Sequence, residues 1–137
     1  ALVTTPGATR FYRSQGEPGQ QHTRIRLAPG ARLEWLPLDA ICYSDCMAEN
    51  RLDMGLAPGA ELMAWDVTAL GLPAARQPFD KGSLLQHIEL SGAWLERGRI
   101  DARDQRLLHG PIGLAGSRRP SMRGVARSQS RSRASTQ

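Results

Sequence analysis

Hydrophobic and polar residues alternate along several short segments of the chain, a pattern that predicts β-strands with one buried face. In segment 23–28, Ile25 and Leu27 fall on one face and two arginines fall on the other. Segment 51–57 alternates in the same way. These segments predict an all-β protein.

The sequence Pro-Gly-Ala occurs three times, at residues 6–8, 29–31 and 58–60. Proline sets φ at the second position of a turn and glycine tolerates positive φ at the third, so each copy predicts a type II turn. Strand candidates flank these turns. The expected architecture is therefore a stack of antiparallel sheets built from repeated hairpin-like units.

The second half of the chain predicts further β-structure and little helix. Segments 84–90 and 93–100 are strand candidates joined by a short turn at Ser91-Gly92. A weak helical turn is expected after Asp101, which would cap it, and segment 112–116 is a candidate for a last strand.

Charge is distributed unevenly along the 137 residues, which we expect to form one domain. The net charge is +5, but residues 118–137 hold six arginines and no acidic residue, so residues 1–117 are close to neutral. We expect residues 118–137 to be a disordered Arg/Ser-rich tail, because few large apolar residues are present to order it. Two interpretations stay open: a native basic tail, or a frame-change artefact near Arg118.

The only two cysteines, Cys42 and Cys46, are expected to be reduced thiols. On one continuous strand their i, i+4 spacing would place them about 13 Å apart, too far for a disulfide. They are either small, partly apolar residues of a strand or part of a metal site with the three histidines, which are His22, His87 and His109.

Three carboxylates lie inside apolar segments and within two residues of a tryptophan: Glu34, Asp66 and Glu96. Each is either on a solvated strand face or buried, where it needs a cation, water or a metal ion as partner. No glycine-rich phosphate loop, nucleophile elbow or paired-carboxylate motif occurs in a supporting context, so no enzyme is predicted.

Four motifs together carry a family resemblance: "TTPGATRFYRS", "GARLEWLP", "WDVTALGLP" and "WLERGRI". In this order and at these separations they resemble the urease accessory protein UreD, also called UreH. The resemblance covers residues 1–117 and implies a partial, non-enzymatic UreD-like β domain. Family members are longer at both ends, so we expect a central fragment.

The resemblance also implies a function and partners. UreD binds apo-urease, recruits UreF and through it the GTPase UreG, and assists nickel insertion into the urease active site. A polar passage has been proposed for the nickel, and the residues that match or adjoin it here are Asp66, Glu96, Thr9 and Glu34. Their oxygen atoms suit transient Ni²⁺ contacts, so no tightly bound cofactor is expected. Leu38 departs from the family pattern, and the cysteines have no inherited metal role.

The alternative function is a generic β-sheet binding module whose basic tail binds nucleic acid. Such binding would weaken steeply with salt. No apolar run approaches the length of a transmembrane helix, and the first residues lack the layout of a signal peptide, so we expect a cytoplasmic protein with no membrane partner.

Overall fold

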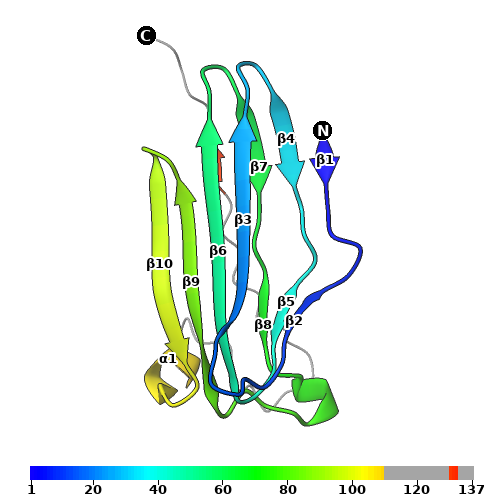
Figure 1. Ribbon diagram of the computed structural model, residues 1–137, viewed down its shortest axis with the longest axis vertical. Helices are drawn as coiled ribbons and strands as arrows, with labels where there is room; N and C mark the ends of the chain where they lie inside the picture. The colour runs from blue at the N-terminus through cyan, green and yellow to red at the C-terminus, as the bar shows by residue number, and fades with distance from the viewer. Residues whose placement is uncertain (110–129, 133–137) are drawn as a thin grey trace.

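The computed structural model describes residues 1–109 and 130–132, which form three sheets (Figure 1). Sheet A contains β1 (Leu2–Val3), β4 (Arg32–Trp35), β7 (Glu61–Ala64) and β11 (Ser130–Ser132), in that order. Sheet B contains β2 (Thr9–Phe11), β5 (Ala40–Cys42) and β8 (Thr68–Leu70). Sheet C has the order β10 (Trp94–Asp101), β9 (Gly82–Leu90), β6 (Cys46–Leu56) and β3 (Gly19–Leu27). The two short helical segments are η1 (Pro73–Ala75) and α1 (Gln105–His109).

The chain winds through the three sheets in the same order three times. We call each of these three repeats a rung. A rung passes through one strand of sheet A and one of sheet B, and returns along a long strand of sheet C (Figure 1). Equivalent strands of successive rungs pair in parallel in all three sheets. Sheets A and B together make one layer, which packs against sheet C.

The predicted antiparallel hairpins at the Pro-Gly-Ala turns are wrong. The turns at 29–31 and 58–60 have the expected backbone, with Gly30 at φ 68° and Gly59 at φ 72°. Each turn joins a strand of sheet C to a strand of sheet A in the opposite layer. The two strands beside a turn therefore contact each other through side chains across the core. Their backbone groups pair instead with the equivalent strand of the next rung, because the repeats stack. The turns stack too: the Gly30 N–H donates to the Pro58 carbonyl at 3.2 Å.

The hairpin and the helical turn predicted in the second half of the chain are confirmed, except for the residue that caps the helical turn. β9 and β10 form the expected antiparallel hairpin, with Gly92 at φ 74°. The helical turn is present as α1, but Asp104 caps it in place of Asp101: its side chain accepts hydrogen bonds from the backbone N–H groups of Arg106 and Leu107. The copy of Pro-Gly-Ala at 6–8 lies in the link between β1 and β2, and Gly7 has no positive φ.

Two predictions fall on the end of the chain. The strand predicted at 112–116 lies outside the described residues, and so does most of the tail at 118–137. The part of the tail that the structure describes, Ser130–Ser132, is strand β11, which pairs antiparallel with β7.

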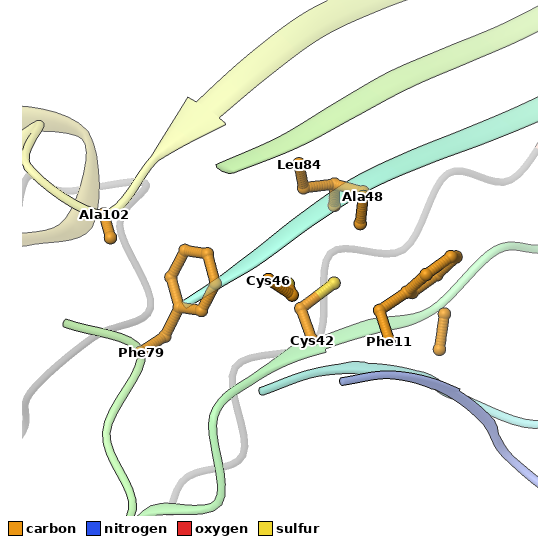
Figure 2. Packing of buried hydrophobic residues seen from close by; sticks show 8 residues of the cluster. Phe11, Cys42, Cys46, Ala48, Phe79, Leu84 and Ala102 are labelled. Carbon is orange, nitrogen blue, oxygen red and sulfur yellow. The ribbon is translucent and has the colours of Figure 1, made fainter. Parts of the chain in front are cut away.

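The core between the two layers consists of two apolar clusters. The first lies between sheets A and C and is formed by Ile25, Leu52, Met54, Leu62, Ala64, Ile88 and Leu90. The second lies between sheets B and C and is closed at its end by the loop that carries Phe79 (Figure 2). Its other members are Phe11, Ala40, Cys42, Cys46, Ala48, Leu84 and Ala102.

The two cysteines are free and fully buried in the second cluster. They do not lie on one continuous strand, because β5 ends at Cys42 and β6 begins at Cys46. A turn with Asp45 at φ 67° joins the two strands, and both cysteines lie in the same apolar cluster (Figure 2). No helix in the described part of the chain is long and apolar enough to span a membrane.

Gly82 allows the third rung to dock on the second, and its replacement tests the stacking. It has φ 102°, and an added Cβ would lie 2.3 Å from the Cys46 carbonyl oxygen. We expect Gly82→Ala to lower the free energy of unfolding by about 2–3 kcal/mol. Gly98→Ala in β10 is the matched control, since no heavy atom lies within 4 Å of its added Cβ. Urea unfolding compares the two variants, and equal stabilities would contradict the stacking.

Candidate functional site

A layer of polar side chains separates the two apolar clusters inside the protein. Three amides occupy one row of sheet C, because Gln21 of β3 pairs in register with Asn50 of β6, and Asn50 with Gln86 of β9. Paired residues of a parallel sheet point to the same face, and this face is the interior. Asn50 is only 2% exposed. Buried amides need hydrogen-bond partners, so this row requires polar groups from the opposite layer.

Asp66 supplies the acceptor that the amides require. It lies in the link between β7 and β8, where the chain passes from sheet A to sheet B. The Asn50 side-chain amide donates to both carboxylate oxygens at 3.2 Å, and the Gln86 amide donates to Oδ2 at 2.6 Å. Burial raises the pKa of Asp66, while the hydrogen bonds from the two amides act in the opposite direction.

Threonine hydroxyls complete the layer on the side of sheet B. Thr9 and Thr68 lie in one row of that sheet, on either side of Ala40. The Thr9 hydroxyl donates to the Gln21 side-chain oxygen at 2.8 Å. The Thr68 hydroxyl oxygen is buried and has no hydrogen-bond partner within the part of the chain that the structure describes. A buried hydroxyl of this kind offers an oxygen to water or a cation.

A small pocket reaches this layer. Its polar wall includes Thr9, Gln21, Asn50 and Asp66, and Trp35 contributes to the apolar wall. About 10 Å³ is open to the centre of a water molecule, which is room for about one water. The Trp65 indole N–H donates to the Pro37 carbonyl at 2.9 Å, which ties together the two links that border the pocket.

The four residues predicted for the polar passage, Thr9, Glu34, Asp66 and Glu96, do not all lie in one site. Thr9 and Asp66 lie in the polar layer and line the same pocket. Glu34 is half-buried in β4 of sheet A, and its position in the sheet lies between Leu2 and Met63. Glu96 is exposed on β10, the edge strand of sheet C farthest from β3. The structure therefore brings together two of the four.

The sequence analysis missed the amides Gln21, Asn50 and Gln86. Asn50 and Gln86 each interrupt a run of inward-facing apolar residues, and Gln21 lies at the equivalent position of β3, between Gly19 and Thr23. That recurrence is the signal that could have found them. The signal has meaning only if the three strands are parallel neighbours. An antiparallel arrangement would place the amides in different rows.

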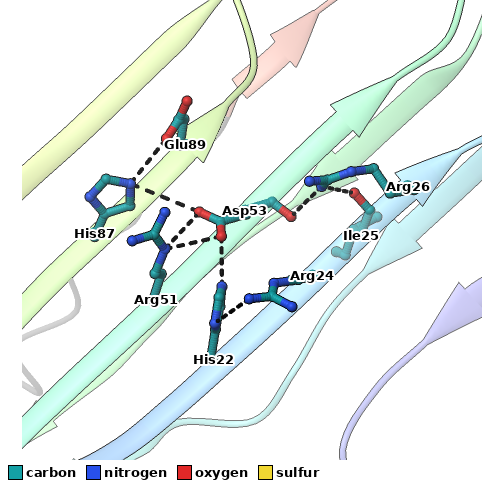
Figure 3. Close-up of polar contacts among 8 residues, drawn as sticks. All are labelled: His22, Arg24, Ile25, Arg26, Arg51, Asp53, His87 and Glu89. Atoms are coloured by element: carbon teal, nitrogen blue, oxygen red, sulfur yellow. Dashed lines mark hydrogen bonds and ion pairs between the residues drawn. The ribbon is translucent and has the colours of Figure 1, made fainter.

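The cysteines and histidines do not form one metal site. Cys42 and Cys46 lie in the core, whereas His22 and His87 lie on the outer face of sheet C (Figures 2 and 3). Burial raises the pKa of Cys42 to about 12 and also raises that of Cys46, so both are neutral thiols near pH 7. The alternative of small, partly apolar core residues is the one that the structure supports. The side chain of His109 is not among the described ones.

The fold and the polar layer together define a class: a mainly parallel, all-β protein whose stacked rungs enclose a carboxylate among amides and hydroxyls. The sequence model of the UreD urease accessory protein family matches residues 1–119. The chain belongs to the UreD urease accessory protein family.

Curated relatives support this membership over most of the chain. The urease accessory protein UreD of Variovorax paradoxus is 69% identical over 117 residues, and that of Albidiferax ferrireducens is 70% identical over 118. The UreD of Methylibium petroleiphilum is 50% identical over 128 residues. These matches cover 85–86% of this chain but 42–43% of the relatives. The chain thus spans about two fifths of the length of the curated relatives it matches.

Removing the Asp66 carboxylate tests the polar layer. In Asp66→Ala the Asn50 and Gln86 amides lose their acceptor, so we expect the free energy of unfolding to fall by about 1–3 kcal/mol. The control Glu96→Ala removes an exposed carboxylate and should change it by less than about 0.5 kcal/mol. Chemical denaturation of both variants at pH 7 measures the difference. An Asp66→Ala protein as stable as the control would show that the amides do not depend on Asp66.

Proposed function

We propose that the chain acts as part of a urease accessory protein that helps to insert nickel into the urease active site. The observation that carries the proposal is a polar layer through the core of a chain that belongs to the UreD family. The proposed role is non-catalytic. The proposed partners are apo-urease, UreF and, through UreF, the GTPase UreG.

The polar layer supports a role in nickel transfer because it presents oxygen atoms inside the protein. Asp66 contributes a carboxylate, and Thr9 and Thr68 contribute hydroxyls. Oxygen ligands hold Ni²⁺ less tightly than thiolates do, which suits an ion that must be released to a recipient. The neutral thiols of Cys42 and Cys46 do not compete for the ion.

The pocket limits how nickel could use this layer. With room for about one water, it does not admit an ion that carries a complete hydration shell. In the proposed passage, therefore, the protein oxygens replace part of the shell as the pocket widens. Glu34 and Glu96 lie outside the layer, so we assign them no contact with nickel at this point of the path.

Two observations favour this function over the alternative of a nucleic-acid-binding module. The family match spans residues 1–119, and residues 1–117 are close to neutral, because the excess of positive charge lies in the tail at 118–137. The polar layer itself offers a carboxylate to its ligand, which suits a cation and not a phosphate.

The test separates nickel transfer from complex formation. Asp66→Asn keeps the size of the side chain and one acceptor oxygen but removes its charge. We expect this variant, co-expressed with apo-urease, UreF and UreG, to co-elute with them and to load several-fold less nickel into urease than the wild type. Glu96→Gln, the matched control, should load as much as the wild type. Metal analysis of purified urease gives the readout.

Two results would count against the proposal, and they differ in meaning. Normal nickel loading by Asp66→Asn would show that the charge of Asp66 in the polar layer is not needed for nickel transfer. A wild-type chain that co-elutes with none of the three proteins would contradict the proposed partners.

A further inference from the structure

A second polar cluster lies on the outer face of sheet C, outside the polar layer. Its members come from three neighbouring parallel strands and occupy two adjacent outward rows of the sheet. The first row holds His22, Arg51 and His87, and the second holds Arg24, Asp53 and Glu89. The stacking that aligns the interior amides therefore also gathers two imidazoles and two carboxylates on the surface (Figure 3).

The nitrogen and oxygen atoms of this cluster converge on Asp53. Nε2 of His22 lies 2.6 Å from one Asp53 oxygen, and Nε2 of His87 lies 3.9 Å from the other. The same His87 nitrogen lies 3.1 Å from an oxygen of Glu89. One atom from each of Asp53, His87 and Glu89 falls within a group whose members are all within 4.8 Å of one another.

The 3.1 Å between His87 and Glu89 is close to the spacing of neighbouring ligands around one metal ion, and His22 lies beside Asp53, outside the group of three. With metal–ligand distances of about 2.1 Å, neighbouring ligand atoms lie about 3.0 Å apart in an octahedron and about 3.4 Å apart in a tetrahedron. Imidazole nitrogens combined with carboxylate oxygens suit borderline divalent ions such as Ni²⁺ and Zn²⁺. The side chains are accessible enough for an ion to enter, since 34% of His22 and 40% of Glu89 is exposed.

Arg51 occupies the place that such an ion would take. Its Nε lies 3.0 Å from both oxygens of Asp53, and 43% of its side chain is exposed. The Arg51 guanidinium therefore neutralises the charge of the Asp53 carboxylate, and because its side chain is partly exposed it can swing away into solvent. A metal ion can bind only if it displaces Arg51 from Asp53. Arg51 therefore lowers the affinity of the site for the ion and makes binding reversible.

We infer that Asp53, His87 and Glu89, with His22 beside Asp53, form a surface site for a borderline divalent ion, Ni²⁺ or Zn²⁺, with Arg51 as the competing cation. The site lies on the opposite face of sheet C from Asn50 and Gln86, so it binds its ion whether or not the interior layer conducts nickel. The inference goes beyond the proposed function in this respect.

The first experiment titrates the 137-residue chain with NiCl₂ against a chromophoric chelator. We expect the double variant His22→Ala/His87→Ala to bind Ni²⁺ at least tenfold more weakly than the wild type. His109→Ala, which removes the third histidine of the chain, is the matched control and should bind as the wild type does. Equal affinities of the double variant and the control would overturn the inference.

Two further measurements keep the test valid if the double variant folds poorly. Arg51→Gln should bind Ni²⁺ more tightly than the wild type, because it removes the competing cation; unchanged or weaker binding would count against the site. In the wild type, substoichiometric Ni²⁺ should broaden the imidazole proton resonances of His22 and His87 before those of His109. Broadening of His109 first would place the ion elsewhere.

Discussion

The structure depends on the parallel register of β3, β6 and β9. This register places Gln21, Asn50 and Gln86 in one inward-facing row, where the amides need hydrogen-bond partners across the core. Asp66 accepts hydrogen bonds from two of these amides, Asn50 and Gln86. The Thr9 hydroxyl donates to the side-chain oxygen of Gln21. A shift of one residue in any strand would turn its amide to solvent and its neighbouring charged side chains inward.

The polar row explains why the second layer is divided. Sheets A and B are short, and the links between them lie at the level of the amides, where Asp66, between β7 and β8, contacts Asn50 and Gln86. The apolar clusters lie on either side of this level and can each pack without polar atoms. The arrangement thus places a half-buried carboxylate between the two apolar clusters, which maintain the fold on both sides. It is the feature on which the proposed nickel transfer rests.

The sequence predicted the strands better than their pairing. Alternation in segment 23–28 and the turns at 29–31 and 58–60 are local properties, and the structure confirms them. Whether the strands beside a turn pair with each other or with the next repeat depends on contacts 29 residues away, which no local pattern reports. The recurrence of Pro-Gly-Ala at intervals of 23 and 29 residues, a loose period, was the available hint of stacked rungs.

The candidate site shows the same limit. Asp66 and Thr9 were identified through the family resemblance, but their partners Gln21, Asn50 and Gln86 were not, because their common row appears only when the rungs are stacked. Glu34 and Glu96 look equivalent to Asp66 in sequence, since each lies near a tryptophan. They differ in the fold: one lies in a strand of sheet A and the other on an exposed edge strand.

The central claim is that Asp66 is half-buried among amides, and its ionisation tests this directly. A carboxyl group whose pKa is raised on folding binds its proton more tightly in the folded chain. Stability therefore falls as the pH rises from the ordinary pKa of about 3.9 through the raised value. A ¹³C NMR titration of the aspartate carboxyl groups, with Asp66→Asn to assign the signal, reports the value. Our account predicts a pKa for Asp66 above the ordinary value. An ordinary or lowered pKa would show a solvated or ion-paired carboxylate and would contradict the buried polar layer.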